Sequence, residues 1–222
     1  MGKLLVIEGL DGSGKATQAK LLADALAAQG RRVRQVSFPD YESDSSALVR
    51  MYLSGAFGTR PGDVNAYAAS SFYAVDRYAS FRRDWGAFHR DGGVVVADRY
   101  TTSNAVHQCS KLPREQWDAF LDWLFSYEYD LLGLPAPDTV LYLRVAPEVS
   151  ERLLQGRRQI TGERADIHER DREYQARSRE AADYCAGRLR WSVIECVRAG
   201  QPRSVQDIHG EVLRRATEAL SC

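Results

Sequence analysis

The sequence has no excess of charge of either sign, because 30 Lys and Arg residues balance 30 Asp and Glu residues among 222. A chain without a net positive field has little attraction for polyanions, so we do not expect a general nucleic-acid or anionic-membrane binder. No apolar run approaches the roughly 18 residues that a membrane-spanning helix needs. The apolar start of the chain is interrupted by Glu8 and Asp11, which does not fit a signal peptide.

Cysteine is scarce and scattered. The four cysteines, Cys109, Cys185, Cys196 and Cys222, form no C-x-x-C pair. We therefore expect reduced thiols in a cytoplasmic protein. The sequence also has no internal repeat, no low-complexity tract and no linker rich in Pro, Gly or Ser, so residues 1–222 are expected to form a single domain.

Strand-like and helix-like segments alternate along the chain. Strands are expected at 4–7, 33–38, 94–97, 139–145 and 191–197, and helices at 16–28, 65–90 and 113–129, with a further helix continuing to about residue 188. Apolar strands separated by helices indicate an α/β fold, a five-stranded parallel sheet flanked by helices on both faces. Ligands of such folds bind beyond the carboxyl ends of the strands.

A phosphate-binding loop follows the first strand. The run GLDGSGK at 9–15 matches the G-x-x-x-x-G-K pattern and opens a helix. Backbone N–H groups of such a loop surround phosphate oxygens, and Lys15 can reach the β and γ phosphates. A P-loop NTPase fold that binds ATP is therefore expected. The residues assigned to ATP from this motif are Gly9, Asp11, Gly12, Ser13, Gly14, Lys15, Ala16 and Thr17.

The loop lacks one hydroxyl group that usually binds magnesium. Ala16 stands where the motif has Ser or Thr, and Thr17 lies about 100° further round the helix. Asp98 ends the apolar run VVVA, as does the aspartate that holds the metal in P-loop NTPases. We expect Mg²⁺ to be held by phosphates, water and Asp98, partly through water. The alternative is impaired catalysis.

Taken together with the loop, four further segments resemble thymidylate kinases. They are Phe-Pro at 38–39, Asp-Arg-Tyr at 98–100, Tyr73 to Arg77 in a long helix, and Pro-Asp at 137–138. The resemblance runs nearly end to end, and the combination is specific, although many NTPases share the loop alone. It implies phosphoryl transfer from ATP to dTMP, giving ADP and dTDP for dTTP biosynthesis. It also implies a homodimer formed through the long helices.

The resemblance implies a dTMP site as well. Arg99 would fork onto the acceptor phosphate, with Tyr41 against the same phosphate and Asp11 near the sugar 3′-hydroxyl. Tyr73 would stack on the base, and Arg77, on the same helical face, would donate to thymine O4. Arginine carries no acceptor, so it suits a carbonyl and not the amine of cytosine. The complete set of expected dTMP residues is Asp11, Phe38, Tyr41, Tyr73, Arg77, Arg99, Asn104, His107, Gln108 and His168.

Four more residues of this set have polar side chains. Asn104 and Gln108 are four residues apart, and their amides would complete the hydrogen bonding of the thymine edge. His107 and His168 stand where the family commonly has an aromatic residue. These two departures weaken the expectation that the site discriminates against a ribose 2′-hydroxyl. Considered alone, Tyr73 is a candidate core residue and Arg77 a candidate surface partner of the neighbouring Asp76.

A mobile lid is expected at about 156–169. Its glycine-bounded segment GRRQITGER at 156–164 lies between two helical segments, where glycine hinges allow closure and arginines can stabilise the transferring phosphoryl group. Some family members carry the catalytic arginine in the phosphate loop, where this chain has Gly12, so the chain resembles the lid type. The expected catalytic residues are Lys15, Asp98, Arg99, Arg158 and Arg164, with Arg157 on ATP.

Two alternative functions are also compatible with this phosphate loop. The first is a kinase of another nucleoside monophosphate or of a deoxynucleoside. Arg99 and Tyr41 favour an acceptor that already bears phosphate, and Arg77 favours thymine or uracil over cytosine. The second, motivated by Ala16, is a catalytically impaired nucleotide-binding regulator, which would bind ATP without turnover.

Overall fold

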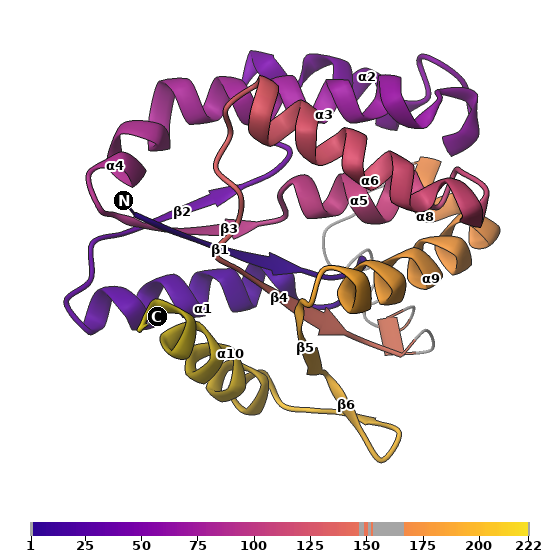
Figure 1. Cartoon of the computed structure of the whole chain (residues 1–222). Coiled ribbons are helices and arrows are strands. Elements are labelled where there is room, and N and C mark those ends of the chain that lie inside the picture. The colour runs from indigo at the N-terminus through magenta and orange to yellow at the C-terminus, as the bar shows by residue number, and fades with distance from the viewer. Residues whose placement is uncertain (1, 147–148, 151, 153–166, 222) are drawn as a thin grey trace.

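The computed structural model describes residues 2–146, 149–150, 152 and 167–221. Within these residues, five parallel strands form one sheet in the order β2-β3-β1-β4-β5 (Figure 1). The strands are β1 (Lys3–Glu8), β2 (Val33–Ser37), β3 (Val94–Asp98), β4 (Thr139–Arg144) and β5 (Ser192–Glu195). The five-stranded parallel sheet expected from the sequence is confirmed.

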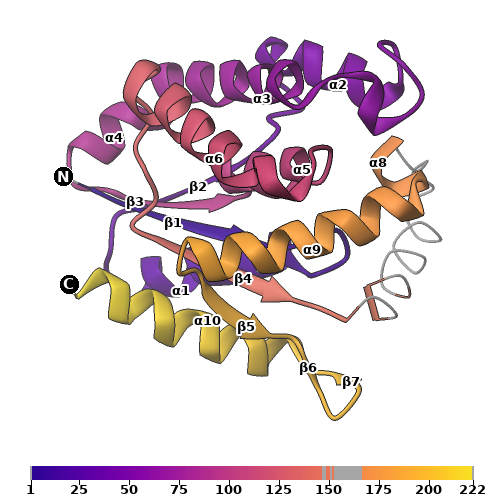
Figure 2. The ribbon, with the colours of Figure 1, turned by 45° about the vertical axis from the view of Figure 1, so that its right-hand side comes forward.

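Helices cover both faces of the sheet (Figures 1 and 2). One face carries α1 (Lys15–Ala28) and α10 (Val205–Leu220). The other carries α3 (Ala66–Ser80), α4 (Gly86–Arg90), α5 (Thr101–Cys109), α6 (Trp117–Phe125) and α9 (Arg172–Arg188). Helix α2 (Ala47–Ser54) packs against α3 and contacts the short α8 (Ile167–Arg170). No helix in the described ranges is long and apolar enough to cross a bilayer.

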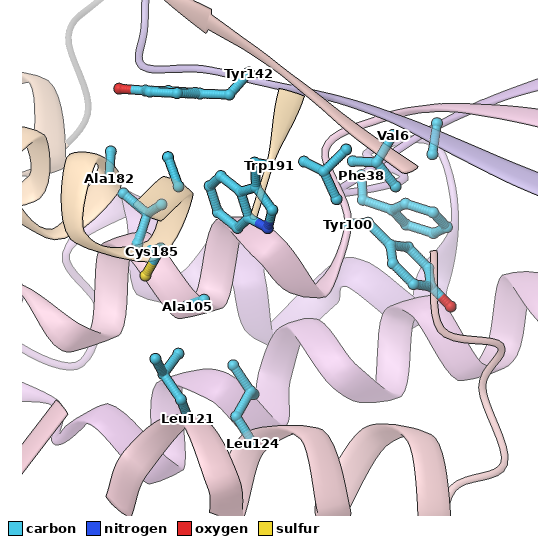
Figure 3. Close-up of a cluster of buried hydrophobic side chains, with 14 of the residues drawn as sticks. Val6, Phe38, Tyr100, Ala105, Leu121, Leu124, Tyr142, Ala182, Cys185 and Trp191 are labelled. Atoms are coloured by element: carbon cyan, nitrogen blue, oxygen red, sulfur yellow. The ribbon is translucent and has the colours of Figure 1, made fainter. Parts of the chain in front are cut away.

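The central strand β1 divides the core into two layers, because successive side chains of a strand point to opposite faces. Leu4 and Val6 join a cluster with residues of α5, α6 and α9, whereas Leu5 and Ile7 join a second cluster with α1 and α10. Figure 3 shows part of the first cluster, with side chains from β1, β4, α5, α6 and α9 facing one another. Both faces of β1 are therefore buried, which explains its continuous apolar sequence.

The bounds of the strands differ from the sequence expectation by one or two residues. Strand β2 ends at Ser37, one residue early, and β5 is shorter than the expected 191–197. A small antiparallel hairpin, β6 (Val197–Arg198) and β7 (Gln201–Pro202), follows β5 and was not expected. Its turn residues Ala199 and Gly200 both have positive φ, 49° and 74°, as a tight two-residue turn requires.

Two expected helices contain changes of helical type. The helix expected at 65–90 consists of α3, a π-helical segment Phe81–Trp85 and α4. The helix expected at 113–129 begins with a 3₁₀ turn, continues as α6 and ends in a second π-helical segment, Ser126–Leu131. Such segments are often found at functional sites. Helix α9 ends at Arg188 as expected. The expected lid at 156–169 lies outside the described residues until Ile167.

Candidate active site

A cavity of about 1370 Å³ lies beyond the carboxyl ends of the strands. Its wall includes a residue at or directly after the ends of β2, β3, β4 and β5, and the loop after β1 from Asp11 onward, as expected for this class of fold. The predicted site residues that line it are Asp11, Gly12, Ser13, Gly14, Lys15, Ala16, Thr17, Phe38, Tyr41, Tyr73, Arg77, Asp98, Arg99, Asn104, His107, Gln108 and His168. Gly9 is not among the lining residues. Arg157, Arg158 and Arg164 lie outside the described residues.

The phosphate loop is tightly folded between β1 and α1. A Cβ on Gly9 would lie 2.9 Å from the Leu143 carbonyl oxygen of β4, so the backbone passes too close for a side chain. Gly12 and Gly14 have φ of 77° and 85°, a region that favours glycine. Lys15 begins α1, and its Nζ donates to the Leu10 carbonyl across the loop at 2.9 Å. The lysine side chain is therefore held over the loop that the sequence predicts to bind phosphate.

The charge of Lys15 is set by opposing effects. Burial and the neighbouring Arg99 lower the pKa of Lys15, whereas Asp11, Asp98 and Glu8 raise it, and the net result is a pKa of about 8. The carboxylates thus keep the ammonium group largely protonated near neutral pH. An incoming phosphate would add negative charge and favour the protonated form further.

Arg99, the residue after β3, is at the centre of the site. Its φ of 67° is left-handed, which is uncommon for a residue other than glycine and is typical of functional positions. Its guanidinium donates to Asp11 and to Ser103 Oγ, and lies 3.4 Å from His107 Nε2 and 3.7 Å from Glu8 Oε1. Burial lowers the pKa of Arg99, but Asp11 and Glu8 outweigh it and raise the pKa above its ordinary value.

Glu8 is a site residue that the sequence analysis missed. Its buried carboxylate accepts from the Gly9 N–H at 2.9 Å, Thr102 Oγ1 at 2.6 Å and Ser103 Oγ at 2.8 Å. It thereby ties the phosphate loop to the start of α5 and faces Arg99. A carboxylate that ends an apolar strand directly before a glycine loop was the available signal, because burying such a charge needs partners.

Asp98 offers an oxygen for a metal. Its side chain is buried at the end of β3, and Oδ1 has no hydrogen-bond partner among the described residues. Burial raises the pKa of Asp98, while Lys15 and Arg99 oppose this rise. In the described part of the chain, no group of three or more His, Cys, Asp and Glu side chains is arranged to hold a metal alone. A magnesium ion bound by Asp98, water and phosphate oxygens fits this set, because Mg²⁺ needs few protein ligands.

Arg77 is paired with a residue that the sequence did not suggest. Its Nε and Nη2 donate to the two carboxylate oxygens of Glu128 at 2.7 and 2.5 Å, and both side chains are buried, at 1% and 0% exposure. The alternative that Arg77 is a surface partner of Asp76 is therefore wrong. Asp76 instead accepts from the Asp40 N–H and Ser45 Oγ. Tyr73 lines the cavity one helical turn before Arg77.

Two amide side chains extend the wall beside Arg77. Asn104 Nδ2 donates to the Ser70 carbonyl at 3.1 Å and lies 3.3 Å from Glu128 Oε1. Gln108, one turn further along α5, is fully buried, and neither its Nε2 nor its Oε1 has a partner in the described ranges. A buried amide without partners is costly, so Gln108 is suited to a ligand that brings its own donor and acceptor.

The two predicted histidines meet at one side of the cavity. The rings of His107 and His168 stack with centroids 5.7 Å apart and planes 18° apart. Tyr52 Oη lies 2.8 Å from His168 Nε2, and Tyr174 Oη donates to the His107 carbonyl at 3.1 Å. Burial lowers the pKa of His107 to about 3, with a contribution from Arg99, and lowers the pKa of His168 well below its ordinary value. Both rings are therefore neutral.

The remaining acceptor-side residues also line the cavity. Phe38 is almost fully buried and packs on Tyr100 with ring centroids 5.9 Å apart, so its role is partly structural. Tyr41 is half exposed at the cavity wall. Arg50 also lines the cavity, and its Nη1 donates to the carbonyls of Tyr41 and Ser43. No sequence pattern had pointed to Arg50.

The fold and this cavity define the chain as a P-loop protein that binds nucleoside phosphates. The model of the thymidylate kinase family matches residues 7–207. A thymidylate kinase of Mycobacterium tuberculosis is 35% identical over 177 residues, which are 79% of this chain and 81% of that protein. The thymidylate kinase of Homo sapiens is 30% identical over 144 residues, 65% of this chain and 61% of that protein.

A solved structure agrees with the fold. The thymidylate kinase structure from Candida albicans superposes with a TM-score of 0.72 at 20% identity, covering 98% of this chain and 93% of that one. The chain belongs to the thymidylate kinase family, which confirms the resemblance seen in the sequence.

Proposed function

We propose that this chain transfers the γ-phosphoryl group of ATP to dTMP, giving ADP and dTDP. One observation carries the proposal beyond family membership. A single cavity contains a lysine-bearing phosphate loop, the central Arg99, and a buried polar wall formed by Arg77, Asn104 and Gln108. This set of groups matches a triphosphate donor, an acceptor phosphate and a base with several polar edges.

The proposed mechanism is in-line transfer between two phosphates. The loop N–H groups and Lys15 hold the β and γ phosphates of ATP, while Arg99 forks onto the phosphate of dTMP. An oxygen of the dTMP phosphate attacks the γ phosphorus, and the bond from that phosphorus to the β–γ bridging oxygen breaks. No general base is needed, because the attacking phosphate is already an anion. Magnesium bound at Asp98 would supply charge neutralisation at the phosphate oxygens.

The catalytic arginine is proposed to come from the lid. Gly12 in the phosphate loop carries no side chain, so the loop supplies no cation other than Lys15. Arg157, Arg158 and Arg164 are the candidates by sequence, and we propose Arg158 and Arg164 as catalytic and Arg157 as an ATP contact. The lid type of thymidylate kinase is accordingly part of this proposal.

We also propose a cytoplasmic homodimer of single-domain chains. Tyr67, Val75 and Tyr78 are exposed apolar or aromatic residues on α3, a helix that the family resemblance places at a dimer interface. The described cysteines, Cys109, Cys185 and Cys196, are free and buried, which supports a reducing compartment.

A panel of acceptors tests the reaction. Turnover with ATP is measured by coupled ADP release for dTMP, dUMP, dCMP, dGMP and thymidine, each with and without Mg²⁺. We expect dTMP to be the best substrate, thymidine to be inactive and turnover to require the metal. A better substrate among the other acceptors would establish the alternative kinase. ATP binding without turnover on every acceptor would establish the regulator, and turnover without Mg²⁺ would exclude the role of Asp98.

A further inference from the structure

Glu128 is buried behind the base-side wall of the cavity and does not line it. It lies in the π-helical segment Ser126–Leu131, between α6 and β4. Its two oxygens accept from Arg77 Nε and Nη2, from Thr101 Oγ1 at 2.7 Å, and from Asn104 Nδ2 at 3.3 Å. One carboxylate therefore holds two side chains of the cavity wall, from α3 and α5 respectively.

The first consequence concerns the charge and direction of Arg77. Burial lowers the pKa of Arg77, but Glu128 outweighs this and raises it, so the guanidinium is permanently charged and paired. Two of its nitrogens donate to the carboxylate. The third, Nη1, donates one N–H to the Tyr100 carbonyl at 3.5 Å, and its second N–H remains for a ligand. The pair has no net charge. Arg77 is therefore a donor for an uncharged carbonyl and does not compete with Arg99 for the acceptor phosphate.

The second consequence concerns the orientation of the Asn104 amide. An ionised carboxylate and a backbone carbonyl only accept hydrogen bonds. Because Nδ2 faces both Glu128 and the Ser70 carbonyl, the amide cannot be reversed without placing oxygen against oxygen. Oδ1 is left to accept from a ligand. Glu128 thus decides which end of this amide the ligand meets.

We infer that Glu128 is a positioning residue that sets the base selectivity of the site by fixing a donor at Arg77 Nη1 beside an acceptor at Asn104 Oδ1. This pattern complements the C4 carbonyl and N3–H of thymine or uracil. It opposes cytosine, which presents an amine at C4 and an acceptor at N3. The inference rests on the proposed kinase function, and it concerns the choice of base and not the chemical step.

The test is Glu128→Gln. Glutamine keeps the shape but offers one acceptor oxygen and an NH₂ group, so Arg77 loses a bond and the Asn104 amide is free to reverse. We expect kcat/KM for dTMP relative to dCMP to fall roughly tenfold to hundredfold, mainly through a higher KM for dTMP, with the KM for ATP unchanged. A ratio within about twofold of the unmodified enzyme would overturn the inference, since one unmatched buried group costs more than that.

Two further variants complete the design. Asp118→Asn removes a carboxylate that pairs with Arg188 on the surface and should leave the ratio unchanged. If the glutamine variant does not fold, Glu128→Asp takes its place, because aspartate retains the negative charge that compensates Arg77. Its shorter side chain cannot reach both Arg77 and Asn104, so its ratio should lie between those of the unmodified and glutamine enzymes. A full ratio in the aspartate variant would overturn the inference.

The two proposals fail in different ways. If the unmodified chain does not phosphorylate dTMP, the proposed function is wrong. If it does so selectively and the Glu128 variants keep that selectivity, the function stands and only the role of Glu128 is wrong.

Discussion

Arg99 and Asp11 form an ion pair that joins the residue after β3 to the phosphate loop after β1. Burial raises the pKa of Asp11, but Arg99 and Lys15 more than reverse this and hold it well below its ordinary value. Glu8 provides a second carboxylate 3.7 Å from the guanidinium. The plane of Arg99 is therefore oriented before a substrate binds, which reduces the ordering that a phosphate must impose.

Arg99→Lys tests whether that orientation serves the acceptor phosphate. Lysine keeps the charge but loses the planar fork, so we expect the KM for dTMP to rise roughly tenfold or more, at about 1.5–3 kcal/mol for lost charged hydrogen bonds. Steady-state kinetics at saturating ATP measure this. Arg34→Lys, at a surface pair with Asp84, is the control and should behave as the unmodified enzyme. An unchanged KM for dTMP would remove Arg99 from the acceptor site.

Lys15 should make ATP binding depend on pH in alkaline solution. Its pKa in the empty site is about 8, and a bound polyanion favours the protonated form, so binding takes up a proton above that pH. We expect the Kd of a non-hydrolysable ATP analogue to rise above pH 8, by up to about tenfold per pH unit. Calorimetric titration between pH 7 and pH 9.5 measures the slope.

Two variants frame the Lys15 experiment. Lys15→Met should bind the analogue weakly and lose this component of the pH dependence. Lys20→Met, on the same helix but in an exposed pair with Asp24, should retain the slope of the unmodified enzyme. The same slope in the Lys15 variant would assign the titration to another group.

The stacked histidines should make the fold less stable in acid. In the unfolded chain their pKa is near the ordinary 6.5, whereas in the folded chain both values are lowered. Below pH 6.5 the unfolded state binds more protons than the folded state. The free energy of unfolding therefore decreases as the pH is lowered, by about 1.4 kcal/mol per pH unit for each histidine, until the folded pKa of that histidine is reached. Above pH 6.5 this contribution is complete and does not change.

Urea unfolding at pH 5.5 and pH 7.5 measures the effect. The combined variant His107→Phe/His168→Phe keeps aromatic rings and should lose less stability between the two pH values than the unmodified chain. His209→Asn on α10 lies outside the stack and should leave the difference unchanged. An equal loss in the double variant would show that other groups control the acid response.

The lid arginines should affect turnover more than affinity. Singly replacing Arg157, Arg158 and Arg164 by alanine should lower kcat by roughly 10³ for at least one of them, because a cation that meets the transferring phosphoryl group acts in the transition state. The KM values for ATP and dTMP should change far less. Arg188→Ala on α9, which pairs with Asp118, is the control. Unchanged kcat in all three variants would refute the lid assignment.

The sequence by itself determined the architecture and the donor side of the site. Apolar runs without alternation report strands buried on both faces, and the glycine spacing of the phosphate loop is a local pattern that ends in Lys15. Asp98 and Arg99 were predictable because they directly follow an apolar strand, where the fold places its ligands. The strand order and the hairpin after β5 required the tertiary structure.

The partners of the buried charges were decided by the tertiary structure alone. Glu128 lies 51 residues from Arg77, and Glu8 lies 95 residues from Ser103, so no spacing in the sequence relates the members of either pair. Arg77 beside Asp76 suggested a surface ion pair, because local patterns report only neighbours along the chain. Which carboxylate meets a buried guanidinium depends on how α3, α5 and the segment after α6 pack, and burial of that charge is stable only when such a partner is present.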